Sequence, residues 1–248
     1  MISHDTIIAL ATKLQTSETN VAREYCQHLF LRALYQQKNS ASLCFKGGTA
    51  IRLVYKSPRF SEDLDFEHVE KTPYDFTKHD IATIEDVLTD TVIAIGRTNI
   101  AVDVKGAAPT SGGYLANIVF RLHGRPIDIR TEFSLRSSKK TRGDLVIITS
   151  EFFPNYSLIA LPRDLIMSGK LTALLSRKKP RDFFDLYYML RANLLPVSQR
   201  TVLPRALALI PHDPAFFTKE LTEFLPSGFH ALLKDFPRLL RQEVKSFI

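Results

Sequence analysis

The chain has 248 residues, of which 45% are hydrophobic and 24% are charged, and its formal charge is +7 at pH 7. This composition excludes a disordered or fibrous chain, and the length suits one large domain or two modest ones. We see no secretory signal and no apolar run that could span a bilayer, so we expect a cytoplasmic protein without a membrane partner. The positive charge favours a polyanionic partner such as nucleic acid.

The cysteines and histidines indicate neither a disulfide nor a metal site. Cys26 and Cys44 lie in apolar segments without paired spacing, which predicts buried free thiols in a reducing compartment. The seven histidines are scattered, and none has the spacing of a metal-ligand pair. We therefore assign no chemistry to either residue type.

The first part of the chain predicts a sheet with flanking helices. Apolar residues at helical spacing predict helices over residues 20–37, 49–55 and 74–95. Short apolar or alternating runs bounded by turn residues predict strands over residues 42–46, 64–69, 98–104, 114–122, 126–133 and 144–149. Most of these strands would extend one sheet.

Strand patterns end near residue 160. Helical spacing then covers residues 162–176 and 181–191, and prolines divide the remainder into shorter helical pieces. The change predicts an α+β fold with two domains, a mixed-sheet domain at residues 1–160 and a helical domain at residues 161–248.

Two acidic residues stand at the start of the predicted strand at residues 64–69. Asp63 and Asp65 are two apart, so on a strand their carboxylates would face the same side while Leu64 and Phe66 face the core. Two neighbouring anions repel each other, and a hard cation such as Mg²⁺, with Mn²⁺ as the alternative, relieves that repulsion while bridging to substrate phosphates. The simpler alternative is an ordinary acidic pattern at a strand end.

A double-glycine turn precedes the acidic pair by one predicted helix. Gly47 and Gly48 lead from a strand into a helix that Thr49 opens. Glycine lets the backbone approach a ligand closely, and the free N–H groups at a helix start attract phosphate. The order of strand, glycine turn, helix and acidic strand suits a nucleoside triphosphate with its metal ion.

The helical part has a second cluster of charged residues. Lys170 and Arg177 are seven apart and share one helical face, and Asp182 and Asp185 share a face of the next predicted helix. These charges, together with Arg181, could bind phosphate or could pair with one another and lock the two helices. The residues alone leave both interpretations open.

Together, the two motifs resemble a known family. Phe45-Lys-Gly-Gly-Thr-Ala-Ile51 followed by Arg59-Phe-Ser-Glu-Asp-Leu-Asp-Phe66 is similar to the signature of the AbiEii-type nucleotidyltransferases, which include toxins of bacterial toxin–antitoxin pairs. The segment from Lys170 to Tyr187 is similar to a later motif of that family. Ser168-Gly169 departs from the expected alanine and glutamate.

The resemblance implies a minimal polymerase-β-like fold and transfer of a nucleoside monophosphate from an NTP to a hydroxyl group. It implies that Asp63 and Asp65 bind metal, that Lys170 binds the triphosphate, and that Asp185 orients the attacking hydroxyl. The helical domain would complete the active-site cleft. The implied acceptor is RNA, such as the tRNA 3′ end, and a cognate antitoxin is the implied partner.

The family fold normally adds a third carboxylate from a neighbouring strand. Asp128 is the best candidate, because it interrupts an apolar strand where a buried carboxylate would be costly without a cation. Either Asp128 or Asp185 would position the acceptor hydroxyl. Glu132 has the same strand parity and is the alternative third carboxylate.

Several polar residues near the motifs have two interpretations. Ser61 could contact the terminal phosphate or could form a turn, and Arg52 and Lys56 are expected to be solvated. The basic loop at residues 136–142 is expected to be solvated, with phosphate binding as the alternative. The same choice applies to a basic stripe at helical spacing, formed by Lys234, Arg238, Arg241 and Lys245.

The leading hypothesis is therefore a metal-dependent nucleotidyltransferase toxin that acts on RNA. Two alternatives remain from the sequence. One is nucleotidylation of a protein or a small molecule, and the other is a non-catalytic domain that binds NTP or RNA. The pair of aspartates favours an enzyme, because a binding module has no need for it.

Overall fold

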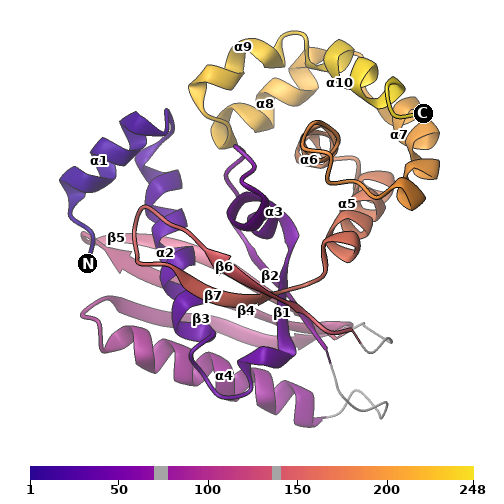
Figure 1. The fold of residues 1–248 in the computed structure, drawn as a ribbon. Coiled ribbons are helices and arrows are strands. Elements are labelled where there is room, and N and C mark those ends of the chain that lie inside the picture. Colours follow the sequence, from indigo (N-terminus) through magenta and orange to yellow (C-terminus); the bar gives the residue numbers. More distant parts are fainter. Residues whose placement is uncertain (70–77, 136–140) are drawn as a thin grey trace. The chain divides into compact units, whose positions relative to one another are not determined.

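The computed structural model describes residues 1–69, 78–135 and 141–248, and contacts within the chain divide it into two compact units (Figure 1). Unit 1 comprises residues 1–13, 17–56 and 61–161, and unit 2 comprises residues 14–16, 57–60 and 162–248. Unit 2 thus includes the four residues that directly precede Ser61. Residues 74–77 of one predicted helix and residues 136–140 of the basic loop lie outside the described residues.

Within the described residues, unit 1 contains a mixed sheet with the strand order β3-β4-β5-β2-β1-β7-β6. β1 pairs antiparallel with β2 and parallel with β7, and β2 pairs parallel with β5. The other neighbours are antiparallel. The strands are β1 (Leu43–Lys46), β2 (Leu64–His68), β3 (Ala101–Thr110), β4 (Gly113–Leu122), β5 (Arg125–Ser134), β6 (Asp144–Ile148) and β7 (Tyr156–Ala160).

Helices flank this sheet. Ser17 caps α2 by accepting a hydrogen bond from the backbone N–H of Asn20, as serine commonly does at a helix start. α2 packs against α1 and α4 and also contacts β5 and β7, while α3 contacts β1 and β2. The helices are α1 (His4–Lys13), α2 (Glu18–Leu34), α3 (Gly47–Tyr55) and α4 (Lys78–Gly96), with a short 3-10 turn, η1 (Ser40–Ser42).

The core of unit 1 is an aromatic row across three adjacent strands. Phe45, Phe66 and Phe133 lie opposite one another in the register of β1, β2 and β5, and all three are fully buried. The ring centroids of Phe45 and Phe66 are 5.6 Å apart, and those of Phe66 and Phe133 are 5.0 Å apart. Because side chains alternate along a strand, the neighbouring residues on these strands point to the opposite face.

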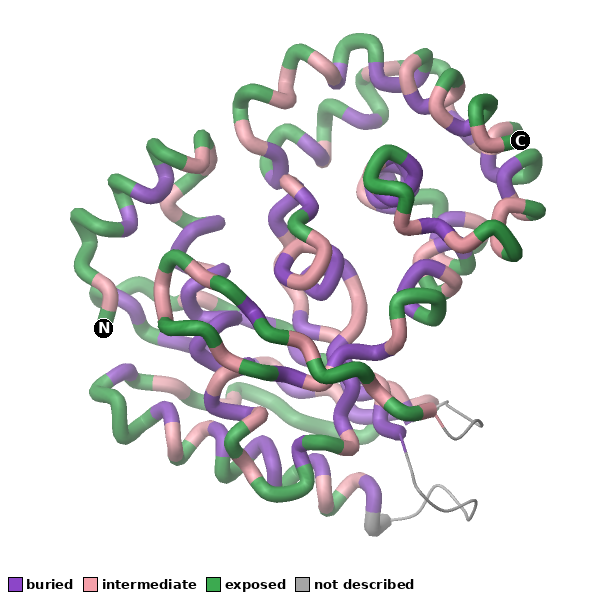
Figure 2. The backbone as a smooth tube through the Cα atoms, in the orientation of Figure 1, coloured by how far each residue is buried: buried purple, intermediate pink, exposed green. Residues whose placement is uncertain are grey.

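Within the described residues of unit 2, all regular elements are helices. Its core surrounds α6, which Figure 2 shows as largely buried, and the rings of Phe184 and Phe217 pack against Phe236 at 5.9 and 4.9 Å. The elements are α5 (Arg163–Arg177), α6 (Pro180–Arg191), η2 (Val197–Val202), α7 (Leu203–Leu209), α8 (Pro214–Phe224), η3 (Ser227–Phe229), α9 (His230–Leu233) and α10 (Phe236–Lys245).

These elements confirm the predicted α+β class with a helical C-terminal part. Two elements were not predicted, α1 and β7. The five-residue strand β7 lies between two prolines, Pro154 and Pro162, and its pairing with both β1 and β6 makes it a strand. In the described part of the chain, every helix is too short or too polar to cross a membrane.

The cysteines are buried and unpaired, as predicted. Burial raises the pKa of the Cys26 thiol to about 12. Burial, with the nearby Glu67 and Asp144 carboxylates, raises the pKa of Cys44 to about 11. Both thiols therefore remain protonated at neutral pH and act as small apolar groups in the core.

Candidate active site

The glycine turn of unit 1 lies directly against one of the predicted metal ligands. β1 ends at Lys46, and α3 begins at Gly47, whose φ of +85° is a conformation that favours glycine. A Cβ atom at Gly47 would lie 1.9 Å from Oδ2 of Asp65. Only a residue without a side chain therefore allows the Asp65 carboxylate to lie over this turn. Gly48 is buried as the next residue of α3.

The acidic pair straddles the start of β2. Asp65 is half-buried on the strand, and its neighbours Leu64 and Phe66 are fully buried, as the alternating pattern predicts. The strand begins at Leu64, so Asp63 lies one residue before it and is also half-buried. The hydroxyl of the buried Thr49 donates to the backbone oxygen of Asp63, which joins the first turn of α3 to the acidic segment.

A polar row crosses the sheet at Asp65. Lys46 of β1 lies opposite Asp65, and Asp65 lies opposite Glu132 of β5. These three residues line a polar cavity of about 150 Å³, together with Thr110, Gly112 and Ser134. The Lys46 ammonium forms an ion pair with Glu67 on the same face of β2. Charged groups of both signs therefore surround Asp65.

Asp128 does not lie beside Asp65. It precedes Glu132 by four residues on β5, a separation of about 13 Å along a strand at roughly 3.3 Å per residue. Its side chain is 51% exposed, and a carboxylate oxygen lies 3.7 Å from Nζ of Lys105. The expectation that Asp128 is a buried carboxylate is wrong, because this part of β5 has one face open to solvent.

In unit 2 a buried carboxylate is bound by two cations. Arg59 donates from Nε and Nη2 to the two oxygens of Asp185 at 2.9 and 3.0 Å, and Lys170 donates to Asp185 at 2.7 Å. Asp185 is fully buried, and the side chains of Arg59 and Lys170 are 3% and 10% exposed. The remaining terminal nitrogen of Arg59 donates to the backbone oxygen of Phe60 at 3.0 Å.

The electrostatics of this cluster keep Asp185 ionised. Burial alone would raise the pKa of the Asp185 carboxyl, but the Arg59 guanidinium and the Lys170 ammonium outweigh burial, so its pKa lies below the usual value. Both carboxylate oxygens accept hydrogen bonds from these cations. Asp185 is thus a paired anion within unit 2, whereas a general base must come within hydrogen-bond reach of the proton it removes.

The other charged residues of the later motif also form ion pairs. Arg177 binds Asp182 with a nitrogen–oxygen distance of 2.7 Å, and Asp182 accepts the backbone N–H of Lys179 at the start of α6. Arg181 lies 2.9 Å from Glu220 of α8. Both pairs match the structural alternative, in which ion pairs hold the helices together.

Arg52 and Arg241, which were expected to be solvated, make contacts within the chain, whereas the side chain of Arg238 stays 58% exposed. The Arg52 guanidinium forms an ion pair with Glu24 of α2, and its side chain is only 13% exposed, so the expectation of a solvated Arg52 is wrong. Within the basic stripe of α10, Arg238 pairs with Asp235, and Arg241 donates to the backbone oxygen of Ile210. Lys56 is exposed, as predicted.

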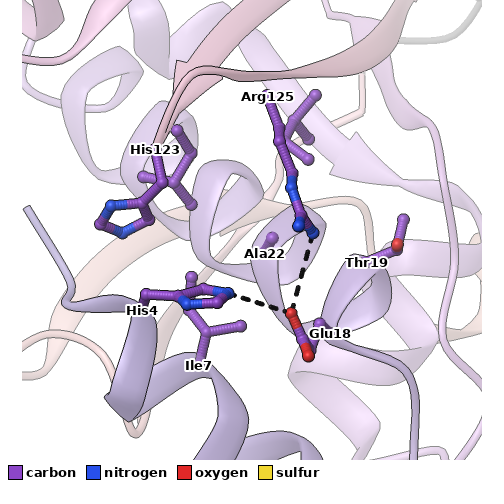
Figure 3. Close-up of a pocket in the computed structure, with 9 residues that line it drawn as sticks. His4, Ile7, Glu18, Thr19, Ala22, His123 and Arg125 are labelled. Atoms are coloured by element: carbon purple, nitrogen blue, oxygen red, sulfur yellow. Dashed lines mark hydrogen bonds and ion pairs between the residues drawn. The ribbon is translucent and has the colours of Figure 1, made fainter.

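A second pocket of unit 1 lies between α1, α2 and the β4–β5 turn (Figure 3). Nε2 of His4 lies 3.2 Å from a carboxylate oxygen of Glu18, and a terminal nitrogen of Arg125 lies 3.9 Å from the same oxygen. His123 contacts the backbone oxygen of Ile2 at 2.9 Å. These groups satisfy one another at the surface, so we assign the pocket no part in the reaction.

A scan against protein-family models matches residues 29–246 to the family described as the nucleotidyl transferase AbiEii toxin of type IV toxin–antitoxin systems. The chain belongs to this family. The matched range includes both motifs on which the resemblance was based, and it confirms that resemblance. Membership makes the chain an AbiEii nucleotidyltransferase, with an NTP as substrate and an antitoxin as the implied partner.

Two crystal structures share the fold. A candidate nucleotidyltransferase from Helicobacter pylori is 18% identical with a TM-score of 0.58, and the match covers 94% of this chain and 99% of that one. The JHP933 protein of Helicobacter pylori is 19% identical with a TM-score of 0.57, and the match covers 93% and 95%. No curated protein matches the chain.

The donor groups of this AbiEii chain suit a metal ion that shares its ligands with substrate phosphates. Within the described residues, no three His, Cys, Asp or Glu side chains form a group that could hold a metal ion. Mg²⁺ commonly binds only one or two carboxylates and takes its other ligands from substrate phosphates and water. Asp63 and Asp65 fit that arrangement, and the lack of a side chain at Gly47 lets the Asp65 carboxylate lie over the glycine turn.

Two contacts near the acidic motif were not predicted from the sequence, those of Arg59 and of Gln27. Arg59 heads the acidic motif, but its partner Asp185 is 126 residues away, so no local spacing could indicate the pair. Gln27 of α2 donates to the backbone oxygens of Ser61 and Glu62 at 3.0 and 3.2 Å. Ser61, which was weighed as a phosphate contact, is half-buried in this segment.

Proposed function

We propose that this AbiEii chain is a Mg²⁺-dependent toxin that transfers a nucleoside monophosphate from an NTP to a hydroxyl of RNA, with the tRNA 3′ end as the acceptor. The observation that supports this most is the contact between Gly47 and Asp65. A turn that favours glycine brings the backbone N–H groups at the start of α3 next to a carboxylate. Phosphate oxygens accept hydrogen bonds from such N–H groups, and a divalent cation binds to a carboxylate.

In the proposed reaction the acceptor oxygen attacks the α-phosphorus of the NTP. A new oxygen–phosphorus bond forms, the bond from the α-phosphorus to the bridging oxygen breaks, and pyrophosphate leaves with the electron pair of that bond. The hydroxyl proton passes to a nearby carboxylate or to water. A bound Mg²⁺ would supply positive charge to the attacking and leaving oxygens, and Asp63 and Asp65 would hold it.

We assign the third carboxylate to Glu132 rather than to Asp128. Glu132 lies opposite Asp65 in the strand register and lines the same polar cavity, whereas Asp128 lies two positions further along that face of β5. Near the metal ligands, Glu132 could orient the acceptor hydroxyl or accept its proton. Lys46, in the same cavity, would provide a positive charge for phosphate.

In unit 2 we assign phosphate binding to Lys170 and a positioning role to Asp185. An ammonium group has three N–H donors, and Asp185 accepts one of those on Lys170. The side chain of Lys170 retains some exposure, whereas Asp185 has none. Asp185 would therefore hold Lys170 in place instead of touching the substrate.

The distribution of charge supports a nucleic-acid acceptor. Unit 1 has 18 lysines and arginines against 18 aspartates and glutamates, while unit 2 has 15 against 8, so unit 2 accounts for the whole net charge of +7. Lys178 and Lys179 are exposed in the turn between α5 and α6, and neither forms an ion pair among the described residues. When exposed lysines of this kind neutralise RNA phosphates, the counterions of those phosphates are released, which favours binding.

The test is incubation of purified protein with each α-labelled NTP, Mg²⁺ and total tRNA. We expect label in RNA, and we expect Asp63→Ala to abolish it. Label that appears only in protein would replace the proposed acceptor with a polypeptide. Absence of label with every NTP, with tRNA and with protein extracts would refute nucleotidyl transfer by this chain.

A matched pair of variants tests the third carboxylate. Glu132 and Asp128 lie on the same face of β5 and have similar exposure, 53% and 51%. We expect Glu132→Gln to lower the transfer rate at least about 100-fold, as loss of a catalytic acid or base typically does, while Asp128→Asn stays within about three-fold of the parent. The reverse order of effects would restore Asp128 to this role.

A further inference from the structure

The backbone just before the metal ligands is held by a buried amide on α2. Gln27 is 2% exposed, and its Nε2 donates to the backbone oxygens of Ser61 and Glu62 at 3.0 and 3.2 Å. A side-chain amide has two N–H donors, so both are used on two consecutive peptide units. Asp63 is the next residue after Glu62.

The same face of α2 makes a second contact with this segment. Arg23 precedes Gln27 by four residues, so the two side chains are neighbours on the helix surface. A terminal nitrogen of Arg23 lies 3.5 Å from a carboxylate oxygen of Glu62, and the Arg23 side chain is 16% exposed. α2 therefore fixes both the backbone and the side chain of Glu62.

A third contact fixes the segment from α3. Thr49 donates its hydroxyl proton to the backbone oxygen of Asp63. Three consecutive peptide oxygens, at residues 61, 62 and 63, thus accept hydrogen bonds from buried side chains of two different helices. Residues 61–63 have no regular secondary structure, so these bonds replace the ladder that would otherwise order the backbone.

We propose that Gln27 is a positioning residue for the metal-binding carboxylates: by binding the peptide oxygens of Ser61 and Glu62, it sets the direction in which Asp63 points. This inference rests on the proposed metal-dependent transfer. Groups that orient metal ligands without touching the metal commonly contribute 10–100-fold to metal affinity or activity. Gln27 does not touch the substrate in this role.

The matched control is Gln37, which follows α2 in the chain. It is also a glutamine whose Nε2 donates to a backbone oxygen, that of Ala33, at 2.7 Å. That oxygen belongs to α2 and not to the acidic segment. Gln37→Leu therefore removes the same type of hydrogen bond from unit 1 without releasing residues 61–63.

The experiment compares Gln27→Leu with Gln37→Leu and the parent. Hydrogen exchange of the peptide that covers residues 60–66 reports the order of the segment in the protein alone. Mn²⁺ titration followed by electron paramagnetic resonance reports metal affinity, and transfer assays report kcat and KM. For Gln27→Leu we expect faster hydrogen exchange of residues 60–66 and a Kd for Mn²⁺ that is 10–100-fold higher than that of the parent. We expect a similar fall in kcat, with KM for RNA within about three-fold of the parent.

Parental exchange and parental Mn²⁺ affinity in Gln27→Leu would overturn the proposal, and so would equal effects of Gln37→Leu. If Gln27→Leu does not fold, Gln27→Asn replaces it, because that amide ends one methylene short of the peptide oxygens, and the same expectations decide the question. If the parent transfers no nucleotide to any acceptor, the proposed function fails. Exchange and Mn²⁺ binding would still decide whether Gln27 orders the segment.

Discussion

The carboxylates of the two units that we propose for the site differ in burial and in charge partners. In unit 1, Asp65 is half-buried beside a glycine turn, and Glu132 lies opposite it with an exposed side chain. In unit 2, Asp185 is fully buried and is bound by Arg59 and Lys170. The units also differ in charge, because unit 1 is formally neutral and unit 2 accounts for +7.

The difference in burial suggests different roles, ligand binding for the acids of unit 1 and positioning of other side chains for Asp185. A carboxylate that is paired and enclosed costs much to disturb, since removing it leaves buried cations without a partner. A carboxylate that is only half-buried, such as Asp65, retains contact with solvent and costs less to disturb. We infer that the acids of unit 1 act on ligands, while Asp185 acts through its two cations.

The largest expected effect is on catalysis by Asp65→Asn. If Asp65 binds the metal as proposed, its loss should reduce transfer by about 10⁴-fold, which is about 5 kcal/mol of transition-state stabilisation. The thermal transition should stay near or above that of the parent, because removing one of two repelling anions relieves strain. Labelled transfer and calorimetry measure the two quantities. A cooperative loss of folding would instead make Asp65 a structural residue like Asp185.

The next effect is on stability, with Asp185→Asn. Leaving Arg59 and Lys170 without their anion should lower the free energy of unfolding by about 3–5 kcal/mol, as measured by urea titration. The folded-state pKa of Asp185 lies below its unfolded value, so its contribution is present above about pH 4 and is lost as pH falls further. The variant should lack this acid-dependent loss. If Asp185→Asn is as stable as the parent, the proposed contrast between Asp185 of unit 2 and Asp65 of unit 1 is wrong.

A smaller expected effect is a loss of stability at acidic pH that is caused by His28 in unit 1. Burial, together with the charges of Lys56 and Arg52, lowers the pKa of His28 to about 3, and its Nδ1 lies 2.7 Å from the Tyr156 hydroxyl. The unfolded chain binds this proton near pH 6.5, so stability should fall by about 2 kcal/mol from pH 7 to pH 5. Urea titrations at the two pH values should show a smaller fall in His28→Gln. If His28→Gln loses as much stability between pH 7 and pH 5 as the parent, other groups cause the loss.

The smallest expected effect is on RNA affinity. Lys178→Ala combined with Lys179→Ala should weaken RNA binding about ten-fold and reduce the slope of log affinity against log salt by about 1.4, near 0.7 for each lost contact with a single strand. A double variant of exposed unit 1 lysines, Lys38→Ala with Lys105→Ala, is the control. Fluorescence anisotropy over a salt series gives both values. Equal losses in the two variants would show that RNA does not distinguish the units.

The local features of the site could be predicted because they depend on neighbouring residues. The alternation of Leu64, Asp65 and Phe66 shows which side chains face the core. A double glycine between an apolar strand and a helix predicts a tight turn, and Gly47 has the positive φ of such a turn. The strand β7 was missed because its five residues become a strand only by pairing with β1 and β6.

The sequence by itself determined the family, the glycine turn and the acidic pair, because each of these is a property of residues close together in the chain. Tertiary structure decided which other groups meet them. The register of β2 and β5 places Glu132, and not Asp128, opposite Asp65. Packing within unit 2 turns Asp185 into a buried partner of Arg59. Register and burial are set by contacts between distant segments, which no local spacing encodes.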